Sequence, residues 1–252
     1  TELLAFPRIC DDVMIMKDII RRTALQYGLT ATFMPKPVFG NAGNGMHFHI
    51  MLHKNGKNLF YKKGGYADLS EEAIWFIGGI LIHGSALVAF TNPSTNSFKR
   101  LLPGFEAPVK LFYGLANRSA AIRIPKYANT PETKRFEFRT GDGTCNPYLA
   151  MSAILLAGLD GIKNRIDPAK YNLGPYDDNV FAWSEDKKAQ LLSIPANLNE
   201  ALQALKEDHQ FLLEGDVFNE ELIESHIELK LKESEAVSAR PHPHEMVLYY
   251  NL

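Results

Sequence analysis

Hydrophobic and polar side chains alternate from Met46 to His53, and this period of two predicts a β-strand. The apolar face would carry Met46, Phe48, Ile50 and Leu52, and the opposite face His47, His49, Met51 and His53. Asn55-Gly56 follows the strand and predicts a hairpin turn. Glycines at 40, 43 and 45 precede the strand, and such a loop lets backbone amides approach a ligand closely.

A second alternating stretch, residues 134–140, also predicts a strand. One face would carry Arg135, Glu137 and Arg139, and the other Phe136 and Phe138. A carboxylate between two arginines suits a site for a metal ion and a phosphoryl group. The alternative is a solvated face of paired charges, which is common on protein surfaces.

Apolar residues at helical spacing predict helices at 11–27, from Ser70 onward, at 146–162, at 197–213 and at 219–235. Shorter apolar runs predict strands at 30–34, 118–125 and 246–250.

No charged residue lies between 73 and 92, a length that could span a membrane. Ser70 and two glutamates begin this stretch like a soluble helix, so we expect a buried core helix. Prolines and a glycine predict an irregular, polar loop at 91–108.

The composition is that of a globular protein with a sizeable core. The 252 residues are 46% hydrophobic and 22% charged, and they would form one large or two small domains. The net charge of −2 gives no reason to expect nucleic acid or a membrane surface as a partner. Cys10 and Cys145 are too few for a disulfide framework, and no signal peptide is evident, so a cytoplasmic location is expected.

Several segments, taken together and in order, closely resemble the catalytic domain of bacterial-type (type I) glutamine synthetases, and the resemblance covers essentially the whole chain. They are Phe33-Met34-Pro35-Lys36-Pro37, Gly45-Met46-His47-Phe48-His49, residues 92–100, Asn117-Arg118-Ser119 with Arg123-Ile124-Pro125, Asn146-Pro147-Tyr148, and the tail at 240–250.

The resemblance implies an α+β domain over residues 1–252, with a curved antiparallel sheet forming the active-site funnel and helices packed outside. It implies ATP-dependent ligation of ammonia to L-glutamate through γ-glutamyl phosphate. Mg²⁺ or Mn²⁺ would be the metal, ATP the co-substrate, and the assembly a homo-oligomer of stacked hexameric rings. Crowded anions in such a reaction require divalent metals and arginines.

Roles for individual residues also follow from the resemblance. His47, Glu137 and, less closely by spacing, Glu2 match metal ligands. Glu106 matches a flap carboxylate that helps deprotonate ammonium. Gly43, Arg100 and Arg139 match contacts to glutamate. His49, Arg118, Arg123 and Arg135 match contacts to the nucleotide, and Arg118 and Arg139 would also act in catalysis.

The sequence departs from the family pattern at several positions. Ala42, Met51 and Glu132 replace Asn, Ser and Lys of many members, and the glycines of Thr140-Gly141-Asp142-Gly143 predict a looser backbone. Phe181 stands at the position of a tyrosine that some members adenylylate, so we expect no such control. The amino-terminal β-grasp domain and a Glu-x-Glu strand have no counterpart, so we expect this chain alone to bind nucleotide weakly and turn over little.

Two other functions are compatible with the same residues. One is a γ-glutamyl ligase that uses a polyamine or another amine, and the second is a non-catalytic relative that serves in assembly.

Overall fold

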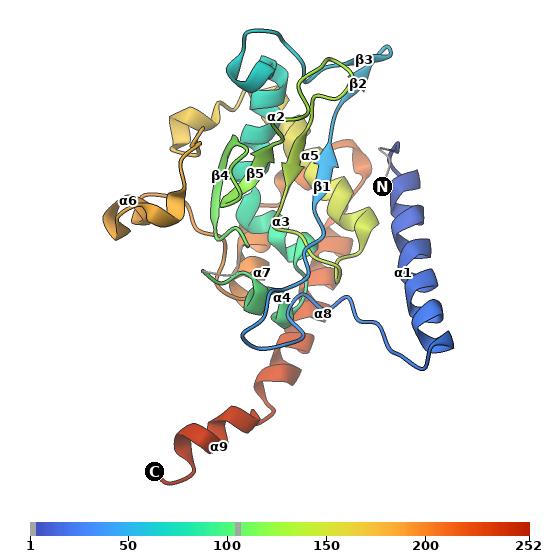
Figure 1. Cartoon of the computed structure of the whole chain (residues 1–252), viewed down its shortest axis with the longest axis vertical. Coiled ribbons are helices and arrows are strands. Elements are labelled where there is room, and N and C mark those ends of the chain that lie inside the picture. The colour runs from blue at the N-terminus through green and yellow to red at the C-terminus, as the bar shows by residue number, and fades with distance from the viewer. Residues whose placement is uncertain (1–3, 104–106) are drawn as a thin grey trace.

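The computed structural model describes residues 4–103 and 107–252, with a four-stranded sheet at the centre and helices around it (Figure 1). The strand order is β1 (Phe48–Ile50), β6 (Phe136–Phe138), β5 (Ala120–Ile124) and β4 (Lys110–Leu115). β6 pairs antiparallel with both neighbours, whereas β4 and β5 pair in parallel. The α+β expectation is confirmed, and the expectation of a purely antiparallel sheet is wrong for this one pair.

The link between β4 and β5 is short and irregular. It has no Asn-Gly or similar dipeptide that would make a tight hairpin. Ala116 takes a left-handed conformation with φ 56°. The Asn117 side chain donates hydrogen bonds to the carbonyls of Tyr176 and Asp178, at 2.8 and 2.7 Å. The link is therefore tied to a distant segment of the chain instead of closing on itself.

The predicted hairpin at Asn55-Gly56 is confirmed. β2 (His53–Lys54) pairs with β3 (Lys57–Asn58), and the two turn residues have φ of 52° and 74°. Both positive angles match the turn type that Asn-Gly favours. The strand before the turn is shorter than predicted, because β1 finds a partner only across Phe136–Phe138.

The charge-free helix is buried as expected, but it is not one helix. It consists of α2 (Glu71–Ile82), capped by the Ser70 side chain, and α3 (Gly84–Thr91), with a 75° bend between them. At the break, His83 contacts Asp160 and Asp208, so tertiary contacts override the local apolar pattern. Within the described residues, no single helix is long and apolar enough to cross a membrane, although this bent pair meets the length and composition limits together.

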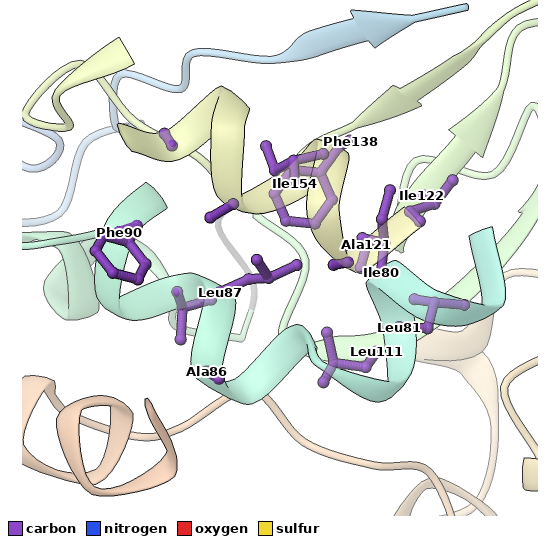
Figure 2. Packing of buried hydrophobic residues seen from close by; sticks show 14 of the residues in the cluster. Ile80, Leu81, Ala86, Leu87, Phe90, Leu111, Ala121, Ile122, Phe138 and Ile154 are labelled. Atoms are coloured by element: carbon purple, nitrogen blue, oxygen red, sulfur yellow. The ribbon is translucent and has the colours of Figure 1, made fainter. Parts of the chain in front are cut away.

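The core lies between the sheet and helices α2, α3 and α5 (Pro147–Asn164), and Figure 2 shows Ile80, Leu87, Ile154 and Phe138 converging there. α2 and α5 approach so closely that a Cβ on Gly79 would lie 2.0 Å from the Ala157 carbonyl oxygen. A Cβ on Gly161 would lie 2.1 Å from the Trp75 carbonyl oxygen. Glycine is therefore required at this crossing for lack of space, not for backbone freedom.

The remaining helices lie outside this core. They are α1 (Arg8–Gln26), α4 (Thr95–Arg100), α6 (Glu185–Ala189), α7 (Leu198–Glu207), α8 (Glu220–Ser238) and α9 (Pro243–Tyr249), with 3₁₀ turns at Tyr66–Asp68, Pro168–Tyr171, Val180–Ala182 and Gln210–Asp216. α9 projects away from the body of the molecule (Figure 1).

Three further local predictions are wrong. The predicted strand at 246–250 is part of helix α9, because Pro243 at its first turn and the His242 cap favour a helix start. The predicted irregular loop contains α4, because the Ser94 side chain caps it by accepting from the Ser97 amide. Residues 30–34 form no strand, since no neighbouring strand pairs with them.

Candidate active site

Glu137 lies at the centre of a charged cluster on one face of the sheet. Its neighbours on β6, Phe136 and Phe138, are fully buried on the other face, as the alternation predicted. Glu137 itself is only 4% exposed. Strand register aligns His49 of β1, Glu137 of β6 and Arg123 of β5 in one row across three strands.

Three side chains contact the Glu137 carboxylate. His47 Nδ1 lies 2.7 Å from Oε1, Arg123 Nε lies 3.0 Å from Oε2, and Arg139 Nε lies 3.6 Å from Oε1. Burial alone would raise the pKa of Glu137, but the His47 hydrogen bond and the two arginine charges outweigh it and lower the pKa. The carboxylate is therefore ionised at neutral pH, so the alternative of a solvated charged face is wrong for this strand.

The surroundings of His49 lower its pKa. Burial lowers the pKa of His49 more than the Glu137 charge raises it, and Arg135 also lowers it. The imidazole is therefore mainly neutral at pH 7, with one ring nitrogen free to accept a hydrogen bond.

The glycine-rich loop packs directly against Arg100. A Cβ on Gly45 would lie 2.6 Å from Arg100 Nη2 and 3.0 Å from His47 Nε2. A Cβ on Gly43 would lie 2.4 Å from the Pro35 carbonyl oxygen and 3.0 Å from Arg100 Cγ. The glycines thus bring the loop backbone, Arg100 and His47 together, and at Gly43 the Pro35 backbone leaves no room for a larger side chain.

Arg100, at the end of α4, is 5% exposed. Its Nη1 donates to the carbonyls of Thr140 at 2.6 Å and Gly141 at 3.2 Å, and its Nη2 donates to the Arg139 carbonyl at 3.3 Å. Burial lowers the pKa of Arg100, and the nearby Asp142 charge opposes that effect. A guanidinium held this way has a fixed position and direction.

Reciprocal hydrogen bonds tie the start of the glycine-rich loop to α4. The Lys36 amide donates to Asn96 Oδ1 at 2.8 Å, and Asn96 Nδ2 donates to the Lys36 carbonyl at 3.0 Å. Asn44 closes the loop by donating from its amide to the Pro35 carbonyl at 2.7 Å. The loop and the arginine helix therefore form one unit.

The remaining residues predicted for the site lie at its margin or outside the described part of the chain. Arg118 is exposed, and its carbonyl accepts a hydrogen bond from Arg139 Nη1. Arg135 stacks over the Tyr127 ring at 5.3 Å. Glu2 and Glu106 lie outside the described residues.

The expectation of a loose backbone at 140–143 is wrong. Thr140 and Asp142 are fully buried. A Cβ on Gly141 would lie 2.6 Å from the Phe48 ring, so this glycine serves close packing. Asn92 Nδ2 donates to the Thr140 carbonyl at 2.8 Å and to Asp142 Oδ2 at 3.0 Å. Sequence reasoning missed Asn92 and Asp142 as site residues, although Asn92 begins the segment 92–100 on which the resemblance partly rests.

The donor chemistry at His47 and Glu137 fits a divalent cation. Imidazole nitrogen and carboxylate oxygen suit Mn²⁺ or Mg²⁺, and Glu137 Oε2 is a buried atom that makes no hydrogen bond beyond its ion pair with Arg123. The described residues contain no group of three or more His, Cys, Asp or Glu that could hold a metal ion. These two residues would therefore supply part of a coordination shell.

The family model for the glutamine synthetase catalytic domain matches residues 5–249. The chain belongs to this family. A glutamine synthetase of Frankia alni is 49% identical over 97% of this chain, and one of Streptomyces coelicolor is 50% identical over 96%. These alignments cover 51% of each relative, so the chain spans about half the length of the curated relatives it matches.

Solved structures agree with this assignment. A glutamine synthetase of Plasmodium falciparum, determined by cryo-EM, superposes with a TM-score of 0.84 at 37% identity over 96% of this chain and 54% of that chain. A GmaS–ADP complex superposes with a TM-score of 0.82 at 31% identity, over 96% of this chain and 54% of that one. These likenesses confirm the fold and the family predicted from the sequence.

Proposed function

We propose that this chain is the catalytic domain of an enzyme that ligates ammonia to L-glutamate at the expense of ATP, through γ-glutamyl phosphate. The observation that carries the proposal is the Glu137 cluster, in which an ionised carboxylate, a histidine and two arginines share one face beside a glycine-rich loop. Membership of the glutamine synthetase family supports it. A cytoplasmic location and a homo-oligomeric assembly belong to the same proposal.

Both ATP and L-glutamate, the anionic substrates of the proposed reaction, carry negative charge. The arginines of the site provide positive charge. Arg123 and Arg139 would hold phosphate oxygens beside Glu137, and Arg118 and Arg135 would contact the nucleotide from the margin of the site. Neutral His49 would accept or donate one hydrogen bond to the nucleotide. Arg100 and the backbone at Gly43 would orient glutamate, and Glu106 would take the proton from ammonium.

His47 and Glu137 would hold one divalent metal. When bound, that metal supplies charge that offsets the developing negative charge on the transferred phosphoryl group. Two ligands make a weak site by themselves, because Mg²⁺ and Mn²⁺ favour six. We therefore propose that further ligands, Glu2 among them, complete the shell.

The test is phosphate release from ATP by this chain with L-glutamate and Mg²⁺ or Mn²⁺, with and without ammonium. Nucleotide binding with and without Mn²⁺ is measured in parallel, since it requires no turnover. We expect His47→Ala to weaken Mn²⁺-dependent nucleotide binding by at least about tenfold, because even loss of an outer-shell partner of a metal ligand costs about that much. His53→Ala, on the β2–β3 hairpin away from the cluster, is the matched control and should leave binding unchanged.

A panel of amines separates the related functions. Release stimulated by a larger primary amine but not by ammonium would assign a γ-glutamyl ligase of different specificity. Nucleotide binding that ignores Mn²⁺ and His47→Ala would contradict the proposed site and favour a non-catalytic relative.

A further inference from the structure

A buried polar network lies beneath Arg100. Asp142 is fully buried, and both of its oxygens accept hydrogen bonds. Oδ1 accepts from the Thr144 amide at 2.9 Å and from the Thr144 hydroxyl at 2.5 Å. Oδ2 accepts from Asn92 Nδ2 at 3.0 Å. A buried carboxylate is costly unless its oxygens are satisfied in this way, so its place here requires a physical reason.

The network reaches Arg100 through the backbone of residues 139–141. The Thr140 carbonyl accepts from Asn92 Nδ2 and from Arg100 Nη1, at 2.8 and 2.6 Å. The Gly141 carbonyl accepts from the Met46 amide at 2.9 Å and from Arg100 Nη1 at 3.2 Å. Asn92, held by Asp142, therefore fixes the Thr140 carbonyl that accepts from the guanidinium, whereas the Met46 amide fixes the Gly141 carbonyl.

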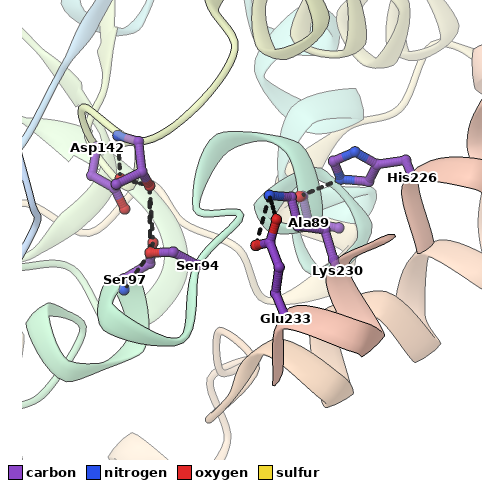
Figure 3. A network of polar contacts seen from close by, with 8 residues as sticks. Ala89, Ser94, Ser97, Asp142, His226, Lys230 and Glu233 are labelled. Atoms are coloured by element: carbon purple, nitrogen blue, oxygen red, sulfur yellow. Dashed lines mark hydrogen bonds and ion pairs between the residues drawn. The ribbon is translucent and has the colours of Figure 1, made fainter. Parts of the chain in front are cut away.

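The same network also reaches the start of α4, the helix that ends at Arg100. The Thr144 hydroxyl lies 3.4 Å from the Ser94 hydroxyl and 3.5 Å from the Ser97 hydroxyl. Figure 3 shows Asp142 facing Ser94 and Ser97. Ser94 is the cap of α4. The Asp142 carboxylate is therefore linked both to the helix that carries Arg100 and to the Thr140 carbonyl that accepts a hydrogen bond from Arg100.

We propose that Asp142, acting through Asn92, is a positioning residue that holds the Arg100 guanidinium in place for the substrate carboxylate. The identity of that substrate rests on the proposed function, whereas the placement of Arg100 does not. Asp142 makes no hydrogen bond to Arg100 itself, so besides the attraction of its charge it acts on the guanidinium through Asn92 and the Thr140 carbonyl and through α4.

The test measures how fast phenylglyoxal modifies individual arginines, by mass spectrometry of peptides from the folded chain. In Asp142→Asn, one side-chain oxygen becomes an NH₂ group, and either the Thr144 or the Asn92 contact is lost. We expect Arg100 to be modified about tenfold faster, the size expected from losing one buried hydrogen-bond partner. Arg139 is buried to the same degree but bound to Glu137 and to the Arg118 carbonyl, so its rate should stay within about twofold.

Asp160→Asn is the matched control, because it removes a carboxylate that contacts His83 far from this network. It should leave both rates unchanged. An unchanged Arg100 rate in folded Asp142→Asn would overturn the proposal. A joint rise at Arg100 and Arg139 would also overturn it, because it would reveal general loosening.

Thr144→Val keeps the test decisive if Asp142→Asn does not fold. Thr144 is exposed at the surface, and the change removes only the hydroxyl that contacts Asp142 and Ser94. We expect a smaller rise in the modification rate of Arg100 alone, and a wild-type rate would reject the proposal.

If the chain turns over, Asp142→Asn should raise the KM for glutamate and leave the KM for ATP unchanged. Nucleotide binding that ignores Mn²⁺ would count against the proposed function only, since the modification rates need no substrate.

Discussion

At the scale of single residues, Glu137 shows how a strand pattern and a strand register contribute different information. Alternation along 134–140 was enough to place Glu137 on the face opposite Phe136 and Phe138. It could not identify Arg123 or His47 as the contacts, because those depend on which strands pair and in what register. The faces of the strand were predictable, and its neighbours on the sheet were not.

Replacing Glu137 with glutamine removes the one negative charge that the cluster shares. His47, Arg123 and Arg139 would then face each other around a neutral amide, which is unfavourable in a buried site. We expect the free energy of unfolding to fall by about 3 kcal/mol and Mn²⁺-dependent nucleotide binding to be lost. Urea denaturation and binding titrations measure the two effects.

Glu185→Gln provides the comparison, because Glu185 is 89% exposed in its pair with Lys188. The free energy of unfolding and the Mn²⁺-dependent nucleotide binding of Glu185→Gln should match those of the unchanged chain. Equal stability of Glu137→Gln and the unchanged chain would mean that the cluster is solvated.

At the scale of helices and strands, the sequence predicted most elements but not where tertiary contacts interrupt them. The α5 start at Asn146-Pro147 and the β2–β3 turn carry local signals, and both are confirmed. Gly84 stands at the break after His83, but the apolar run continues on both sides and carries no proline or charge signal. The break depends on carboxylates from α5 and from the end of α7, which are distant in sequence.

At the crossing of α2 and α5, we expect a Gly→Ala change to lower the stability of the protein instead of raising it. Gly→Ala within a helix ordinarily stabilises a protein by about 0.5–1 kcal/mol. At Gly79 the new methyl group would strike the Ala157 carbonyl and the Gly161 backbone, neither of which can rotate away. We expect Gly79→Ala to lower the free energy of unfolding by about 3 kcal/mol, measured by urea denaturation. An increase would mean that the helices are farther apart than described here.

The contacts of His83 make the stability of the helix break depend on pH. Burial alone would lower the pKa of His83, but the hydrogen bonds and charges of Asp208 and Asp160 outweigh it and raise the pKa above its usual 6.5. A raised pKa means that the protonated form stabilises the fold. That contribution is complete below pH 6.5 and is lost as the pH rises through the folded-state value.

We therefore expect His83→Gln to cost more stability at pH 6 than at pH 9, as measured by denaturation at each pH. His226→Gln is the control of opposite sign. Burial lowers the pKa of His226, and the neutral ring lies 3.0 Å from the Ala89 carbonyl oxygen, so its contribution is complete above the usual pKa and falls at lower pH. Identical pH profiles for the two variants would contradict the assignment of His83.

At the scale of the whole molecule, α1 has an unusual distribution of side chains. Its apolar spacing predicted a helix, and in the structure Ile15 and Ile19 are 57% and 56% exposed while Lys17 is buried. Lys17 Nζ donates to the Gly143 carbonyl at 2.5 Å and thereby fastens the helix to the loop before α5. Helical spacing correctly predicted the helix, but it could not determine which face is covered.

The exposed face of α1 should make the isolated chain associate with itself and bind the dye ANS. Replacing Ile15 with Glu and Ile19 with Lys adds an i,i+4 ion pair and removes two apolar side chains from the surface. We expect lower ANS fluorescence and less self-association by sedimentation velocity, at unchanged thermal stability. A marked loss of stability would show that this face is packed in solution.

The row of His49, Glu137 and Arg123 has a consequence for the order in which the molecule folds. His47 and Glu137 are 90 positions apart, so the cluster cannot form until β1 and β6 have met. Closing so long a loop is among the slow steps of folding, whereas a hairpin such as β2–β3 closes in microseconds. During refolding, Mn²⁺-dependent nucleotide binding should therefore appear only in the slowest phase, after helical structure has already formed.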